Sequence, residues 1–206
     1  MNTRWKGCLL EILETVLLTV IIFWVVQNFV AQPFKIYQPS MERTLEPDQM
    51  VLVDKITPVF TGYNRGDVIV FQPPKGFEDA NNDPFIKRLI GLPGDLVQIH
   101  DDSVYVNGVK LDEPYVYDGQ PTTPSTGQSS WRVPDGQFFV MGDHRAESKD
   151  SRVFGPIAKS TVVGRAFVRY WPLSTFGVVQ SAHYSGIPDS PPPSSSEPSL
   201  LPSPSQ

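Results

Sequence analysis

A long apolar run near the amino terminus most constrains how this chain can fold. Residues 15–31 read TVLLTVIIFWVVQNFVA, and Gln27 and Asn28 are the only strongly polar side chains in this run. With the apolar residues just before it, the run covers 9–31, which is about the 20 residues that a helix needs to cross the hydrocarbon core of a bilayer. We therefore expect a short tail over 1–8, a single transmembrane helix over 9–31 and a folded domain after it.

Other interpretations of the apolar run fit less well. A cleaved signal peptide needs small residues at two positions before the cut, and Phe29 is bulky at one of them. A buried core helix, or an amphipathic helix lying on a membrane surface, fits less well because the run lacks a polar face. The flanking charges are nearly balanced, with Arg4 and Lys6 before the run and Lys35 and Arg43 after it. The positive-inside rule therefore gives only a slight preference for a cytoplasmic amino terminus.

From residue 32 onward the pattern changes to short runs of β-branched and aromatic residues separated by turns. The strand candidates are 50–53, 68–71, 96–100, 104–106, 138–141 and 162–170. Asn107-Gly108 in VYVNGVKL is typical of a two-residue hairpin turn. No segment keeps a helical period. We therefore expect a mainly β domain over 32–186, built from strongly bent antiparallel sheets.

Two stretches are expected to lie outside these sheets. Residues 112–130 contain Pro-Thr and Pro-Ser pairs and two glycines, which indicates an exposed loop insertion. Residues 187–206, IPDSPPPSSSEPSLLPSPSQ, are rich in proline and serine. Such a segment buries too little apolar surface to offset the entropy lost on ordering, so we expect a disordered tail.

The composition argues against several classes of function. The net charge is -5, so the chain lacks the positive field that would hold a nucleic-acid backbone. The single cysteine, Cys8, cannot form an intramolecular disulfide. His100, His144 and His183 lie far apart in the sequence without the spacing of metal ligands, so no metal site is expected.

Four short segments hold the residues that could perform chemistry. They are PFKIYQPSMERTL at 33–45, RGDVIVF at 65–71, FIKRLIGLPGD at 85–95 and MGDHRAESKDSRVFGPI at 141–157. Each alone has an ordinary structural explanation, since a lone serine is usually a turn residue and a lone lysine a solvated one. Together, their order and content resemble the motif series of type I signal peptidases, which are membrane-anchored proteases with a Ser/Lys dyad.

This resemblance implies roles for particular residues. Ser40 matches the nucleophile and Lys87 matches the general base. Ser148 matches a hydroxyl that orients the lysine, and Asp150 and Arg152 match a supporting ion pair. Five residues are expected to line shallow apolar pockets for small side chains, normally alanine, at the first and third positions before the cut: Phe34, Ile36, Met41, Leu45 and Ile86.

The chemistry of a Ser/Lys pair sets its own conditions. A serine hydroxyl becomes a useful nucleophile only when a neighbour removes its proton. Lysine can do so only as the neutral amine, and burial has to lower its pKa from the usual value of about 10.4. Phe85 and Ile86 can supply apolar surroundings for Lys87. Alternation along a strand would point Arg88 away from this base.

Two positions depart from the family pattern. Gln38 stands where a serine or threonine usually supports the oxyanion, and Arg43 stands in place of a proline. A glutamine amide can also donate a hydrogen bond. We therefore expect the oxyanion to be held by the N–H of Ser40 together with either Gln38 or another donor.

Other functions compete with this interpretation. Asp143 and His144 suggest a Ser-His-Asp triad, but the side chains of adjacent residues rarely face each other. We therefore expect His144 to be a polar loop residue. We expect Asp143 and Arg145 to make local hydrogen bonds within a turn. A self-cleaving repressor-type protease would carry a DNA-binding domain instead of an apolar segment. An inactive anchored β-domain that acts as a binding module is the alternative from another class.

The favoured function is removal of amino-terminal signal peptides from exported preproteins, after small residues. The expected partners are preproteins and a lipid bilayer, without a cofactor, and the oligomeric state is not indicated. The expected location is a bacterial cytoplasmic membrane, which the chain crosses once, with the catalytic domain on the extracytoplasmic face. A thylakoid-type membrane would give the same sequence pattern.

Overall fold

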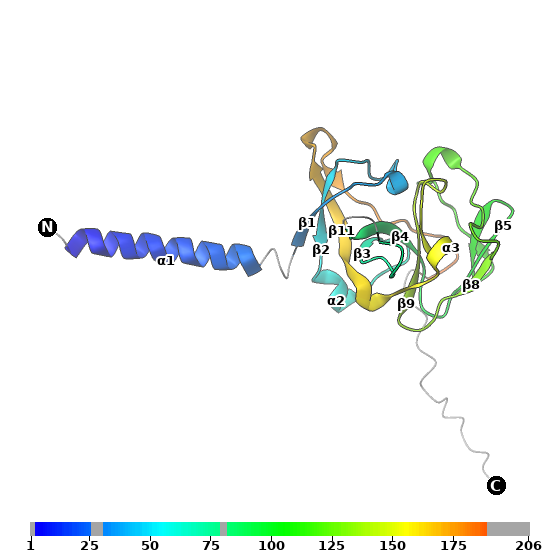
Figure 1. Ribbon diagram of the computed structural model, residues 1–206, viewed down its shortest axis with the longest axis horizontal. Helices are drawn as coiled ribbons and strands as arrows, with labels where there is room; N and C mark the ends of the chain where they lie inside the picture. The colour runs from blue at the N-terminus through cyan, green and yellow to red at the C-terminus, as the bar shows by residue number, and fades with distance from the viewer. Residues whose placement is uncertain (1–2, 26–30, 79–81, 189–206) are drawn as a thin grey trace, which may run out of the picture.

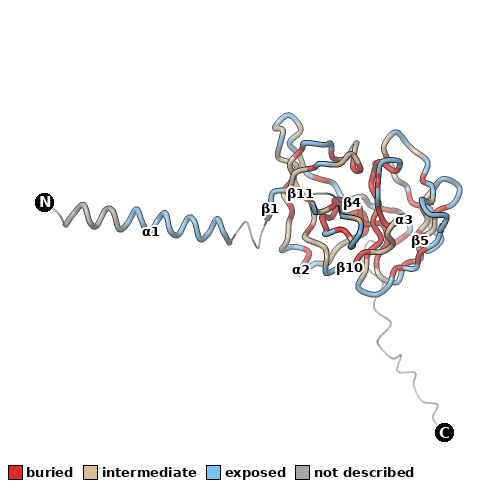
Figure 2. The backbone as a smooth tube through the Cα atoms, viewed as in Figure 1, coloured by how far each residue is buried: buried red, intermediate tan, exposed pale blue. Residues whose placement is uncertain are grey.

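One long helix and a β domain make up the described part of the chain. The computed structural model describes residues 3–25, 31–78 and 82–188. Helix α1 (Thr3–Val25) stands apart from the β domain, which forms the body of the molecule (Figure 1). The described side chains of α1 are exposed, whereas buried residues concentrate in the strands of the domain (Figure 2).

Helix α1 corrects the expectation of a membrane-spanning segment. Large apolar side chains from Ile12 to Trp24 are exposed along it. Glu11 and Glu14 interrupt the apolar sequence in its first half. Within the described ranges, no helix is both long and apolar enough to cross a membrane. The helix ends at Val25, and residues 26–30 of the predicted span lie outside the described part of the chain.

The larger sheet contains eight strands and confirms the expected bent antiparallel architecture. Its order is β1-β2-β11-β3-β4-β9-β10, with β12 paired to β11. The bounds are β1 (Ala31–Lys35), β2 (Met50–Asp54), β3 (Val68–Phe71), β4 (Phe85–Gly91), β9 (Gln137–Met141), β10 (Ile157–Ala158), β11 (Val162–Trp171) and β12 (Gly177–Val178). Register shifts interrupt the pairing of β11 with β2 and β3, and of β4 with β9. Such irregularities bend a strand and increase its twist, which curls the sheet.

The smaller sheet has four strands in the order β7-β6-β5-β8. They are β5 (Leu96–His100), β6 (Ser103–Val106), β7 (Val109–Lys110) and β8 (Ser130–Arg132). Asn107 and Gly108 join β6 to β7 with φ angles of 52° and 81°. Positive φ at both central residues is what a type I′ turn requires, so the predicted hairpin is confirmed.

Short helical turns connect the strands. They are α2 (Thr57–Thr61), α3 (Ser151–Phe154), and the 3₁₀ turns η2 (Pro39–Met41), η3 (Tyr117–Gly119), η4 (Lys159–Thr161) and η5 (Leu173–Thr175). Turn η2 is packed onto the larger sheet, because Met41 and Leu45 are fully buried beside Val53 and Val68. This packing fixes the segment that carries Ser40.

Two segments differ from the sequence prediction, one in its burial and one in where it ends. Residues 112–130 are only partly exposed, because Val116 and Thr122 are buried. The domain continues to Pro188, and Ile187 packs in the apolar cluster between the two sheets. The rest of the predicted tail, 189–206, lies outside the described residues.

Candidate active site

A hydroxyl and an amine from distant segments meet inside the β domain. Turn η2 supplies Ser40 and strand β4 supplies Lys87, and Lys87 Nζ lies 2.6 Å from Ser40 Oγ. Lys87 Nζ also donates to the backbone oxygen of Ile86 at 3.0 Å. Both residues are buried, with 1% of Ser40 and none of Lys87 exposed. The structure thus brings the predicted pair together.

Burial changes the protonation of Lys87. Loss of solvation lowers the pKa of the Lys87 amine to about 8, although the carboxylates of Asp150 and Asp143 act in the opposite direction. The ring of Phe85 lies 5.2 Å from Nζ and forms part of the apolar surroundings. A lysine with such a pKa is neutral in a substantial fraction of molecules at mildly alkaline pH, which a general base requires.

Local sequence explains how η2 aims Ser40 at the amine. Pro39 occupies the first position of the turn, where its fixed φ favours helical geometry. The N–H of Glu42 donates to Pro39 O at 2.9 Å, and that of Leu45 donates to Met41 O at 2.7 Å. Met41 and Leu45 are buried as anchors just after Ser40, and the Ser40 hydroxyl is directed at Lys87 of β4.

Strand β4 separates two cations that are adjacent in sequence. All seven of its residues are buried, and it pairs with β3 on one side and β9 on the other. Lys87 contacts Ser40, whereas Arg88 forms a two-pronged ion pair with Asp143 at 2.9 and 2.7 Å. Alternation along the strand therefore keeps the permanent charge of Arg88 away from the amine, as expected.

The chain segment after β9 passes beside Ser40. The N–H of His144 donates to Ser40 O at 3.1 Å. A Cβ on Gly142 would lie 2.5 Å from Ser40 O and would also collide with Ser148 Oγ. Only glycine therefore permits this close approach, and the segment fixes one side of the nucleophile.

Ser148 is buried but does not make the bond expected of it. Its Oγ has no hydrogen-bond partner by geometry, so it does not hold Lys87 in this structure. It does lie close enough to Asp150 to help lower the pKa of that carboxyl. The role of Ser148 in orienting the lysine therefore stays a prediction.

Asp150 and Arg152 form a buried two-pronged ion pair. Arg152 Nε donates to Asp150 Oδ1 at 2.9 Å, and Nη2 donates to Oδ2 at 2.8 Å. Asp150 also accepts the N–H of Gly142 at 3.0 Å. Burial alone would raise the pKa of Asp150, but the bonds from Arg152 and Gly142 hold it below its ordinary value. The pair thus anchors the segment that touches Ser40.

The five residues predicted to line substrate pockets separate into two groups. Ile36, Met41 and Leu45 are fully buried in the core under the larger sheet. Ile86 belongs to the same cluster and Phe34 packs against it, but both also line a shallow depression. The depression is completed by Tyr37, Gln38, Asp83, Pro84 and Phe85. The sequence pattern alone did not distinguish pocket walls from core.

The structure does not support a Ser-His-Asp triad. His144 Nδ1 lies 2.7 Å from Glu42 Oε2, and its ring stacks on Tyr117 with centroids 4.3 Å apart. Asp143 was expected to make local turn bonds but instead binds Arg88, 55 residues away in sequence. In the described ranges, no three His, Cys, Asp or Glu side chains gather as metal ligands would.

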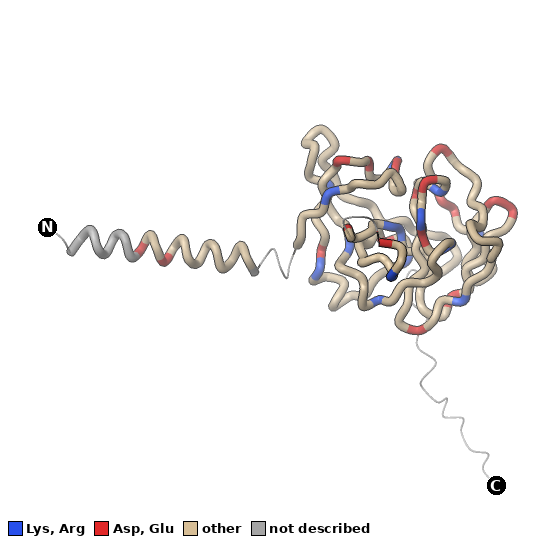
Figure 3. The backbone as a smooth tube through the Cα atoms, viewed as in Figure 1, with Lys and Arg blue, Asp and Glu red and all other residues tan. Residues whose placement is uncertain are grey.

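Apart from the pair of Asp150 with Arg152, sequence reasoning missed the buried ion pairs around the site. Charged residues of both signs are spread through the β domain (Figure 3), and several of them are buried. Arg145 makes one local bond, to Gly142 O at 2.9 Å, but its main partner is Glu113, 32 residues away. No motif spacing connects these two positions, so the sequence offered no signal for the pair.

A buried serine that is hydrogen-bonded to a lysine of lowered pKa is the arrangement of a serine protease that uses an amine as its general base. Comparison with known proteins agrees. The family model described as signal peptidase, peptidase S26, matches residues 9–171. The probable signal peptidase I-2 of Synechocystis sp. is 38% identical over 171 residues, covering 82% of this chain and 77% of the relative. Signal peptidase IB of Staphylococcus aureus is 36% identical over 185 residues, covering 83% and 94%.

A solved structure is also similar in sequence. The crystal structure of a signal peptidase I from Enterococcus faecalis V583 is 36% identical, covering 49% of this chain and 93% of that chain, with a TM-score of 0.40. From the family match and the two relatives above, the chain belongs to the signal peptidase family, peptidase S26, and is a serine endopeptidase.

Proposed function

We propose that this chain acts as a signal peptidase I that uses Ser40 as nucleophile and neutral Lys87 as general base. Its substrates are preproteins, from which it removes the amino-terminal signal peptide. The observation that carries the assignment is the 2.6 Å contact between Lys87 Nζ and Ser40 Oγ in a buried site.

The reaction follows from the chemistry of this pair. Ser40 Oγ attacks the scissile carbonyl carbon while its proton passes to the lone pair of Lys87 Nζ. The resulting ammonium then donates that proton to the leaving amine, which leaves an acyl-enzyme on Ser40. A water molecule, deprotonated by the again neutral Lys87, hydrolyses the ester and releases the signal peptide.

The oxyanion needs at least one donor close to the nucleophile. Ser40 is the second residue of η2, and the first N–H groups of a helical turn have no partner inside it. We assign the N–H of Ser40 as one donor. Gln38 borders the same depression as Ile86 and is the candidate for a second donor.

Substrate selection is assigned to the depression lined by Phe34 and Ile86. It is shallow and mainly apolar, so it fits a small side chain such as alanine better than a large one. The buried residues Ile36, Met41 and Leu45 support its floor from the core rather than contacting substrate.

Helix α1 is proposed to attach the enzyme to a membrane, with the catalytic domain on the extracytoplasmic face of a bacterial cytoplasmic membrane. Its exposed apolar side chains from Ile12 to Trp24 favour lipid contact. Deleting residues 1–30 is expected to move the protein from the membrane pellet to the soluble fraction after a carbonate wash. A full-length chain found in the soluble fraction would contradict this attachment.

Single substitutions at the dyad test the catalytic assignment. A preprotein with alanine at the first and third positions before its cut is incubated with enzyme in detergent, and the products are mapped by mass spectrometry. Ser40→Ala and Lys87→Ala are expected to abolish cleavage while the variants remain folded. Unchanged cleavage would remove Ser40 and Lys87 from the mechanism. A wild-type chain that binds the preprotein without cutting it would favour the binding-module alternative.

A further inference from the structure

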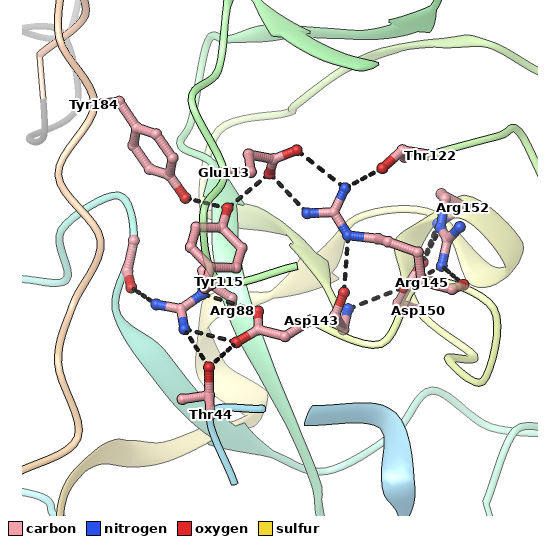
Figure 4. A network of polar contacts seen from close by, with 12 residues as sticks. Thr44, Arg88, Glu113, Tyr115, Thr122, Asp143, Arg145, Asp150, Arg152 and Tyr184 are labelled. Carbon is pink, nitrogen blue, oxygen red and sulfur yellow. Dashed lines mark hydrogen bonds and ion pairs between the residues drawn. The ribbon is translucent and has the colours of Figure 1, made fainter. Parts of the chain in front are cut away.

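The segment expected to be an exposed insertion contributes a buried carboxylate near the active site. Glu113 accepts two hydrogen bonds from Arg145, at 3.1 Å from Nη1 and at 2.7 Å from Nη2 (Figure 4). The hydroxyl of Tyr115 donates to Glu113 at 2.6 Å and lies 2.6 Å from the hydroxyl of Tyr184. The Arg145 side chain is 1% exposed and that of Glu113 is 9% exposed. The pair is therefore shielded from solvent.

Arg145 connects this pair to the backbone beside the nucleophile. Its Nε donates to Gly142 O at 2.9 Å, and its own carbonyl accepts from Arg152 Nη2 at 2.7 Å. Between these two points, the N–H of His144 donates to Ser40 O. The backbone from Gly142 to Arg145 is thus held on one side by the guanidinium and contacts Ser40 on the other.

No other carboxylate in the described part of the chain replaces Glu113 as a direct partner of Arg145. Asp143 is near, but both of its oxygens accept from Arg88. Thr122 Oγ1 also accepts from Arg145, but it carries no charge. A buried arginine that loses its carboxylate is strongly unfavourable and tends to move toward water. Movement of Arg145 would displace the Gly142 carbonyl with it.

We propose that Glu113 is a positioning residue of the peptidase reaction, which acts through Arg145 to hold residues 142–145 against Ser40. The inference rests on the proposed nucleophilic role of Ser40. Glu113 does not contact Ser40 or Lys87, so its effect should fall on the chemical step rather than on substrate binding. A displacement of a catalytic group by about 1 Å can cost roughly 100-fold in rate.

The substitution Glu113→Gln tests the proposal because it keeps the shape of the side chain and removes its charge. We expect kcat for preprotein cleavage to fall by about 10- to 100-fold with KM nearly unchanged. Hydrogen exchange, followed by mass spectrometry, should become faster in the peptide covering 141–148. This second readout does not depend on activity, so it separates failure of the positioning role from failure of the proposed mechanism.

Two matched variants serve as controls. Asp112→Asn removes the same charge one residue earlier, at an exposed position, and should leave both readouts unchanged. Asp95→Asn breaks another buried pair, Arg65 with Asp95 at 2.7 Å, whose side chains bond to residues outside 141–148, namely Ile90, Leu92, Asn107 and Pro188. It should lower the melting temperature without lowering kcat below that temperature. A positioning role and a general loss of stability are thereby distinguished.

A folded Glu113→Gln enzyme with wild-type kcat, or with wild-type exchange over 141–148, overturns the proposal. If Glu113→Gln does not fold, Tyr115→Phe replaces it, because this change removes the hydroxyl that donates to Glu113 and keeps the ring 4.0 Å from the Arg88 guanidinium. A smaller loss of kcat with faster exchange would then support the role of Glu113, and unchanged values would reject it.

Discussion

Lys87 and Arg88 are neighbours on β4, yet their cationic groups serve different partners on opposite faces of the strand. The Lys87 amine meets Ser40, and the Arg88 guanidinium is neutralised by Asp143. Asp143 would otherwise favour the charged form of Lys87 more strongly, because an unpaired carboxylate stabilises a nearby ammonium. The pairing of Arg88 with Asp143 thus lets burial dominate the pKa of the amine.

Replacing Lys87 by methionine should stabilise the folded protein at neutral pH. The pKa of Lys87 is lowered from 10.5 to about 8, so between these values the unfolded chain binds a proton that the folded chain does not. The free energy of unfolding therefore rises with pH through this window. Below pH 8 the folded protein carries the full cost of burying the charged amine, about 3 kcal/mol at 1.36 kcal/mol per pH unit. Urea unfolding at pH 7 should show Lys87→Met to be the more stable protein by up to this amount.

The pH dependence provides the control for that measurement. The advantage of Lys87→Met should shrink as the pH is raised from 8 toward 10.5, because the cost of removing the proton from the wild-type amine on folding falls as the pH approaches its unfolded pKa. A variant that is less stable than wild type at pH 7 would show that the buried lysine is not destabilising.

Asp150→Asn should destabilise the protein strongly. The change leaves Arg152 buried without its carboxylate, a loss of about 3–5 kcal/mol for a pair of this kind. Asp48→Asn is the matched control, since the ion pair between Lys35 and Asp48 is exposed and should contribute little. Denaturant unfolding of both variants measures the difference. An equal loss of unfolding free energy in the two variants would contradict the claim that burial makes the pair of Asp150 with Arg152 the more stabilising one.

Gly142→Ala should impair catalysis by displacing the nucleophile. The added Cβ would meet Ser40 O and Ser148, both close to the dyad, so we expect kcat to fall by about 100-fold. Gly177→Ala is the control, because a Cβ there has its nearest neighbour, Thr175 O, 3.9 Å away. Preprotein cleavage by the two folded variants is compared, and a Gly142→Ala enzyme of normal kcat would disprove the close packing at Ser40.

The sequence predicted the fold where a simple period was present. The candidate strands at 68–71 and 96–100 coincide with β3 and β5. An alternating or continuous run of apolar residues can be recognised as a strand from the local sequence alone. The short strands β10 and β12 were not predicted, since each has only two residues and depends on a neighbour for its pairing. The proximity of Ser40 to Lys87 followed from the family resemblance rather than from any period.

The supporting contacts could not be predicted for a different reason. An apolar residue such as Met41 suits a pocket wall and a core equally well, and only the packed structure decides between them. Glu113 and Arg145 come from segments with the sequence character of solvated loops, and their burial depends on how the two sheets close around them. Long-range ion pairs of this kind leave no local signature in a single sequence.

The pH profile of kcat/KM tests the central claim most directly, because it reports the pKa values of essential groups in the free enzyme. With Lys87 as base, kcat/KM should rise as the amine loses its proton and level off above a pKa of about 8. A profile that keeps rising toward the ordinary lysine pKa near 10.5 would contradict a desolvated base at this position.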